Sequence, residues 1–366
     1  MGGKEAQQED IHGCAAKMLA ACNKPLRVDV GSLAGNLKPL VEQFQARAEA
    51  VVRRANAFLP ASRRCDAQII ICEAPGYGAF AMRGRYDFIV LNIGLVPTLT
   101  DFFQRMMATA GLWPGFGEQD SLSESEPFNV PEGFRAHMLW NVLPARAPSD
   151  ALRTALATVF MSECFDFIVR HELAHLVLGH LRDDARSIRA DSVAMHALEF
   201  FADGHSALWG LEPLRDMPRK IDRIPSPLGD AYKEFHRSLD DAFTNYLLVI
   251  FLVLRLMDET DWTERTFASK SHPPAPMRFN GVCIHLVEYF KQIGDSEGEA
   301  RVLRTMEHIW ELGERIFAAT LGIEPNPDIK RLTLSELSEE HYERMSEKTR
   351  SLPPYLFDLG HDQPAS

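Results

Sequence analysis

The sequence lacks the features that mark secreted, membrane-spanning and nucleic-acid-binding proteins. Its six cysteines are scattered with no Cys-x-x-Cys pair, which suits a reducing compartment better than a disulfide framework or a thiolate zinc site. No signal-peptide hydrophobic region follows the polar N-terminus. The most apolar run, residues 246–254, is far shorter than the about 20 residues that cross a bilayer. A formal net charge of −12 argues against nucleic acid as a partner. These absences predict a cytoplasmic protein without stable membrane insertion.

What is present is the composition of a globular protein: 366 residues, 46% hydrophobic and 25% charged, enough for a sizeable core. Apolar residues recur with helical spacing in several stretches, which are 37–59, 241–257, 282–290, 302–321 and, with more charge, 333–348. Strand patterns occupy 67–72, 79–82 and 86–92, and the last two predict a hairpin within a small antiparallel sheet. Residues 1–30 show no clear period, so we expect a partly ordered leader there.

We therefore expect an α+β, mainly helical chain in three parts. Residues 1–60 form the leader and a helix, 61–280 a core, and 281–366 a C-terminal helical extension. Within the core, 112–148 is rich in Pro, Gly, Ser and Glu and predicts a long loop or insertion, either a lid or a passive loop. Ser149 is a candidate helix cap, and one long helix or two shorter ones fit the stretch that follows.

The most informative stretch is His171-Glu172-Leu173-Ala174-His175, a His-Glu-x-x-His motif within an apolar, helical sequence. On a helix the two histidines project from one face, about one turn apart, where both can bind one zinc ion. Glu172 then lies beside the metal and can deprotonate a water molecule. Two histidines and a glutamate on an exposed helix face are the alternative, but burial without partners would be costly in so apolar a segment.

A zinc ion held by two histidines needs a third protein ligand. Leucine at positions 178 and 181 excludes the metzincin pattern, and His180 lies about 140° around the helix from His175, a poor direction for a ligand. Glu199 and Asp203 share a face of a helical stretch from 191 to 209. Glu199 is the candidate third ligand, and Asp203 can accept a hydrogen bond from a ligand histidine.

These landmarks resemble the M48-type gluzincin metallopeptidases. The similar segments, in order, are Gly78-Ala79-Phe80-Ala81, the strand at 89–96, the zinc helix with His180, Glu199-Phe200-Phe201-Ala202-Asp203, and Ser271-His272-Pro273 with Arg278. The resemblance covers roughly 65–96 and 155–280. It departs from the family at Gly78, where the family has Asn, in the long stretch between Gly94 and the zinc helix, and in the absence of membrane-spanning segments.

The resemblance implies a zincin-like fold, one zinc ion per chain bound by His171, His175 and Glu199, and Glu172 as general base. Asp203 would support a ligand histidine, His272 would face the developing oxyanion, and Arg278 would brace the site. A turn after a helix is the other explanation for His272. The segment Gly78, Ala79 and Phe80 would offer a strand edge to substrate, unless the sheet serves only as core.

The sequence thus predicts a zinc-dependent endopeptidase acting on polypeptides, because no motif that captures a chain terminus is visible. Two alternatives stay open: a binding or regulatory module with a structural metal, and a soluble peptidase of the phage-exclusion Lit type. The sequence does not define the natural substrate, the oligomeric state or the role of the C-terminal helices.

Overall fold

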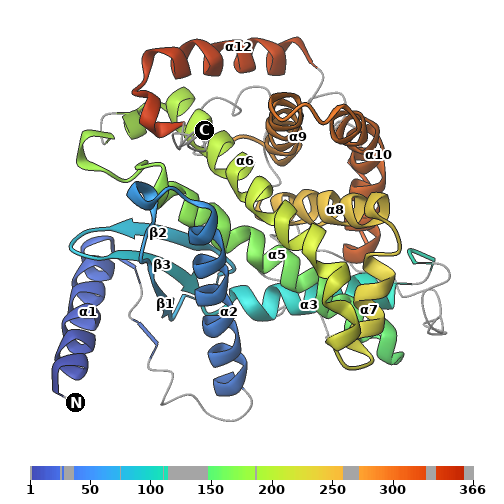
Figure 1. The fold of residues 1–366 in the computed structure, drawn as a ribbon, viewed down its shortest axis with the longest axis horizontal. Coiled ribbons are helices and arrows are strands. Elements are labelled where there is room, and N and C mark those ends of the chain that lie inside the picture. The colour runs from blue at the N-terminus through green and yellow to red at the C-terminus, as the bar shows by residue number, and fades with distance from the viewer. Residues whose placement is uncertain are drawn as a thin grey trace.

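The computed structural model describes residues 2–24, 27–28, 37–74, 76–109, 111–113, 147–185, 188–258, 272–326 and 335–357. The expected mainly helical architecture is confirmed, with one small sheet beside a body of packed helices (Figure 1). The predicted loop or lid lies almost entirely outside the described residues, as does Ser271.

The sheet has three strands, β1 (Gln68–Cys72), β2 (Ala79–Arg83) and β3 (Asp87–Asn92), in the order β1-β3-β2. The expected β2–β3 hairpin is present, with Ala79 opposite Leu91. The prediction of a purely antiparallel sheet is wrong, because β1 pairs with β3 in parallel, Gln68 opposite Phe88. Periodicity identifies strands but not their relative direction, which depends on how the chain connects them. Consequently β2 is an edge strand in the described sheet.

Both faces of the sheet are covered, since its strand residues alternate between two hydrophobic clusters. Ile70, Phe88 and Val90 pack against Ile11, Ala15 and Leu19 of helix α1 (Gly2–Ala21). The opposite face joins the main core beneath α2 (Leu37–Phe58) and α5 (Ala151–Val177). The expectation of a partly ordered leader is therefore wrong for α1. One short apolar stripe, packed on the sheet, stabilises this helix.

The long helices α5 and α6 (Ser192–Asp216) pack side by side and carry the chemically interesting residues (Figure 1). The stretch that begins near 150 is one continuous helix, capped by Asp150 rather than Ser149, because the Asp150 side chain accepts a hydrogen bond from the Arg153 amide. Around this pair lie α3 (Leu95–Ala108), α7 (Leu228–Phe235), α8 (Leu239–Met257), α9 (Ala275–Gln292) and α10 (Ser296–Leu321). Helices α3 and α7 were not foreseen.

One hydrophobic core joins the three parts expected from the sequence, since it includes Val41 of α2, Phe165 of α5 and Trp310 of α10. Helix α12 (Glu336–Ser351) lies across α6, and the described residues after it turn back toward the end of α5 (Figure 1). The irregular tail expected after Pro353 instead includes a short 3₁₀ helix, Pro354–Leu356. Among the described helices, none combines the length and apolar character that a bilayer crossing requires.

A candidate metal centre between two helices

The histidine motif occupies the last two turns of α5, and the chain changes direction just beyond it. Helix α5 ends at Val177, and Gly179 has a φ of +75°, the left-handed conformation that ends helices and favours glycine. Arg83 at the end of β2 donates a hydrogen bond to the Leu176 carbonyl at 2.9 Å. The sheet and the motif are thereby fixed relative to each other.

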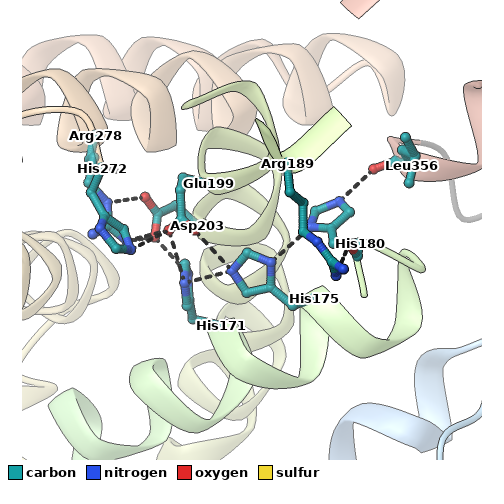
Figure 2. A network of polar contacts seen from close by, with 9 residues as sticks. All are labelled: His171, His175, His180, Arg189, Glu199, Asp203, His272, Arg278 and Leu356. Carbon is teal, nitrogen blue, oxygen red and sulfur yellow. Dashed lines mark hydrogen bonds and ion pairs between the residues drawn. The ribbon is translucent and has the colours of Figure 1, made fainter. Parts of the chain in front are cut away.

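Three side chains converge where α5 faces α6, which are His171, His175 and Glu199 (Figure 2). Nε2 of His171 lies 3.1 Å from Nε2 of His175. The two Glu199 oxygens lie 3.3 Å from His171 Nε2 and 3.4 Å from His175 Nε2. Tetrahedral ligands at roughly 2.0–2.1 Å from a zinc ion are about 3.3–3.4 Å apart. The spacing of the three groups therefore matches three corners of such a site.

When the two imidazole rings are neutral, the supporting contacts leave lone pairs, rather than hydrogens, at the centre of this cluster. Asp203 Oδ1 lies 2.9 Å from His171 Nδ1, somewhat off the ideal hydrogen-bond direction, and places the ring hydrogen at Nδ1. Glu199 Oε2 is buried without a hydrogen-bond partner among the described residues. A buried carboxylate oxygen that accepts no hydrogen bond and lies beside two imidazole nitrogens is costly unless a cation lies between them.

The carboxylates of the cluster are in turn held by Arg278 of α9. Its Nε and Nη2 donate to the two Asp203 oxygens at 2.7 and 2.8 Å, and Nη2 also lies 3.5 Å from Glu199 Oε2. Glycines permit this close approach of α6 and α9: a Cβ at Gly204 would come 2.5 Å from the His285 ring, and one at Gly281 equally close to Phe200. A larger residue at either position would clash with the facing ring at this helix contact.

His180 supports the second histidine from the other side. Its Nδ1 lies 2.9 Å from Nδ1 of His175, and its Nε2 lies 2.8 Å from the Leu356 carbonyl (Figure 2). Burial lowers the pKa of His180 well below its usual value, and His175 acts in the same direction, so the ring is neutral. His180 is therefore a neighbour of a ligand candidate and not itself one of the three converging groups.

Charge in the cluster is unbalanced without a cation. Glu199 and Asp203 are two buried carboxylates against one guanidinium, Arg278. Burial opposes ionisation of Asp203, but Arg278 and His171 hold the pKa of that carboxyl below its ordinary value. Likewise burial opposes a charge on His171, yet Asp203 and Glu199 raise the pKa of His171 to about 10. The site attracts either a proton or a metal ion.

A cavity of about 340 Å³ opens beside the cluster. Its lining includes His171, Glu172, His272 and Arg278, together with Gly76–Ala79 and Met257. Glu172 is 6% exposed. The His272 side chain is 54% exposed, and its Nε2 lies 3.6 Å from Glu199 Oε2. Both residues expected to act on substrate therefore border the same space.

The edge of β2 meets this cavity at its first residues. Gly78 and Ala79 line the cavity, whereas the Phe80 side chain packs toward α1 with the Lys24 ammonium over its ring. The Gly78 carbonyl accepts a hydrogen bond from the Asn92 amide of β3. In an antiparallel ladder the next residue then aims its own N–H and C=O away from the partner strand. Ala79 thus presents its backbone polar groups to the outer edge.

The structure brings the predicted residues His171, His175 and Glu199 together, and two further groups near them were not predicted from the sequence. One is the backbone carbonyl of Leu356. No side-chain motif can predict its role, because every residue has a carbonyl. Met257, which lines the cavity, lies at the end of a helix expected only as core. No protein-family model, curated protein or solved structure matches this chain.

Proposed function

We propose that the chain is a zinc-dependent endopeptidase that hydrolyses peptide bonds of polypeptides. The observation that carries the proposal is the convergence of His171, His175 and Glu199 beside a cavity that His171 lines together with Glu172 and His272. Three protein ligands with access from a cavity are typical of catalytic zinc, whereas structural zinc has four ligands and no access.

Zinc fits these residues better than the other common divalent ions. Two imidazole nitrogens and one carboxylate are a donor set that zinc prefers, while magnesium and calcium favour oxygen ligands. His171, His175 and Glu199 would hold the ion. Bound zinc would supply a Lewis acid that polarises a carbonyl oxygen and lowers the pKa of water to about 7.

Side chains of the protein would supply proton transfer, stabilisation of the oxyanion and orientation of the ligands. Glu172 would take the proton of the attacking water and deliver it to the leaving amine, as its position one residue after His171 and its place on the cavity wall favour. His272 would donate a hydrogen bond to the carbonyl oxygen as negative charge develops there. Arg278 and Asp203 would keep His171 and Glu199 in orientation.

An extended substrate segment would lie antiparallel or parallel to the edge of β2, pairing with the Ala79 backbone. Tyr77, Ala79 and Met257 give the cavity apolar walls, which favours an apolar substrate side chain next to the scissile bond. A strand edge captures the middle of a polypeptide as readily as its end, so internal cleavage is the expected mode. The six free cysteines fit action in the cytoplasm.

The decisive experiment is Glu172→Gln, assayed on a peptide library blocked at both termini, with zinc content measured in parallel. We expect retained zinc and loss of cleavage by roughly 10²–10⁴-fold, because the general base is removed while the ligands remain. Glu212→Gln, an exposed exchange on α6, is the matched control and should cleave normally. Cleavage persisting in Glu172→Gln would contradict the proposal, and zinc bound without any cleavage by the wild-type chain would favour a structural metal.

A further inference from the structure

The residues that follow α12, 352–357, form a segment that we call the C-terminal strap. Leu356 at its centre is fully buried and packs with Ala185 and Leu198. The strap crosses the end of α5, where Tyr355 lies near Gly179. It therefore reaches the back of the metal cluster, opposite the cavity side, from a part of the chain more than 170 residues later in sequence.

Contacts that do not involve His180 fix the strap in place. The Tyr355 hydroxyl donates to Asp184 at 2.9 Å, and the Arg182 guanidinium lies over the Tyr355 ring. The Phe357 ring packs on Phe201 with centroids 4.5 Å apart, and the Phe357 carbonyl lies 3.3 Å from His205 Nε2. The helix before the strap is anchored independently, since the Tyr342 hydroxyl donates to the Met277 carbonyl at 2.7 Å. The Leu356 carbonyl is thus held without depending on the histidine it meets.

A chain of hydrogen bonds runs from that carbonyl through His180 to His175 of the metal cluster. For His175 to offer the lone pair of Nε2, its hydrogen must be on Nδ1 and must be accepted there. The atom within reach is His180 Nδ1, at 2.9 Å. His180 accepts at Nδ1 only when its own hydrogen is on Nε2, and the Leu356 carbonyl, which can only accept, lies 2.8 Å from Nε2. If His180 carried its hydrogen on Nδ1 instead, that hydrogen would face the Nδ1 hydrogen of His175, and the lone pair of Nε2 would face the Leu356 carbonyl oxygen.

We propose that the C-terminal strap is a positioning element of the metal centre, acting through the Leu356 carbonyl and His180 to fix the tautomer and ring orientation of His175. The inference rests on the metal site of the proposed function. It gives His175 the same support that Asp203 gives His171, so each candidate histidine ligand is held by a second partner on a different element. His180 and Leu356 touch no substrate in this arrangement, and their effect is on the metal.

The test measures zinc affinity in the full-length chain by competition with a chromophoric chelator. His180→Phe, which removes both ring nitrogens, should weaken zinc binding about 10–100-fold, the usual cost of losing such a partner. His180→Asn keeps an acceptor near the position of Nδ1 and should lose less. Leu356→Asp places a carboxylate in an apolar cluster and should detach the strap, with a loss of at least about tenfold.

The double variant His180→Phe/Leu356→Asp separates this role from simple structural support. Both changes break the same chain of contacts. The zinc affinity of the double variant should therefore equal, within about twofold, that of whichever single variant binds zinc less tightly. Arg350→Gln, an exposed exchange near the end of α12 just before the strap, is the matched control with unchanged affinity. Additive losses, or a detached strap with wild-type affinity, would overturn the inference.

Two further measurements keep the outcomes distinct. Metal-free circular dichroism and limited proteolysis after residue 351 establish that each variant folds and whether the strap is released. If Leu356→Asp does not fold, equal affinities of His180→Phe and His180→Asn overturn the inference. Failure of the wild-type chain to bind zinc would overturn the proposed function as well, whereas tight zinc binding that His180→Phe leaves unchanged would overturn the strap's role alone.

Discussion

Arg278 holds Asp203 through two parallel hydrogen bonds, from Nε at 2.7 Å and from Nη2 at 2.8 Å. Both residues are buried, and Asp203 lies directly behind the Nδ1 of His171. A planar guanidinium meets a carboxylate in this paired geometry, which a lysine ammonium cannot reproduce. The orientation of one candidate ligand therefore depends on a residue from α9, which is more than 100 positions later in the chain.

Arg278→Met should be the most damaging substitution outside the three ligand candidates. It leaves Asp203 buried without its partner, and breaking such a pair costs about 3–5 kcal/mol of stability. Urea unfolding of the metal-free variant measures the loss. Arg278→Lys keeps the charge but not the two parallel hydrogen bonds, so its free energy of unfolding should lie between those of Arg278→Met and the wild type. Equal stability of all three proteins would show that the pair contributes nothing.

Zinc binding should release a proton from the site at neutral pH. The pKa of His171 is raised to about 10 without metal, against 6.5 for an ordinary histidine, so the ring is protonated at pH 7–8 and zinc must displace that proton. Titration calorimetry in buffers of different ionisation enthalpy should yield at least about one proton per zinc at pH 8, with any further release coming from zinc-bound water. Asp203→Asn keeps all three ligands but removes a carboxylate that raises this pKa, so it should release less, and unchanged release would assign the proton to another group.

The same shift gives the metal-free chain a pH-dependent stability of definite sign. Because the folded state binds the His171 proton more tightly than the unfolded state, its contribution is complete below pH 6.5 and is lost as the pH rises to about 10. Chelator-treated protein should therefore unfold at lower urea concentration at pH 9.5 than at pH 7, with a smaller difference in His171→Asn. A reversed dependence would contradict the charge balance described for the site.

His272→Ala should slow turnover without releasing zinc. Its side chain is half-exposed on the cavity wall and lies beyond the converging ligand atoms, so its removal takes away a donor to the developing oxyanion. Loss of one such donor typically lowers kcat about 10²–10³-fold. Steady-state kinetics with a blocked peptide, together with zinc content, makes the measurement. A zinc-free variant would instead make His272 a ligand.

Ala79→Pro tests the substrate strand. Proline removes one outward N–H of the β2 edge while leaving the ladder bonds to β3 intact, so KM for an extended peptide should rise and zinc content should not change. Ala81→Pro makes the same change two residues farther from the cavity and is the matched control with a smaller effect. If the two variants bind substrate alike, the strand edge next to the cavity has no special role.

Local sequence was sufficient for much of this chain, because helical periodicity and the spacing of His171, Glu172 and His175 are set by the helix itself. The same is true of Glu199 and Asp203, four residues apart on one face of α6. These patterns gave the mainly helical fold and the members of the cluster without any knowledge of how the helices pack. They could not give α1, whose few apolar residues form a stripe only once the sheet is beside them.

Only the tertiary structure decided the relative direction of the strands and the long-range partners of the site residues. The parallel pairing of β1 with β3 depends on the path between strands, and the closeness of Arg278 to Asp203 depends on glycines that let two helices approach. The contact of His180 with Leu356 involves a backbone carbonyl, which carries no side-chain signature at all. The sequence by itself determined which groups can bind a metal; long-range packing decided which groups orient them, because such contacts join residues whose spacing along the chain has no period.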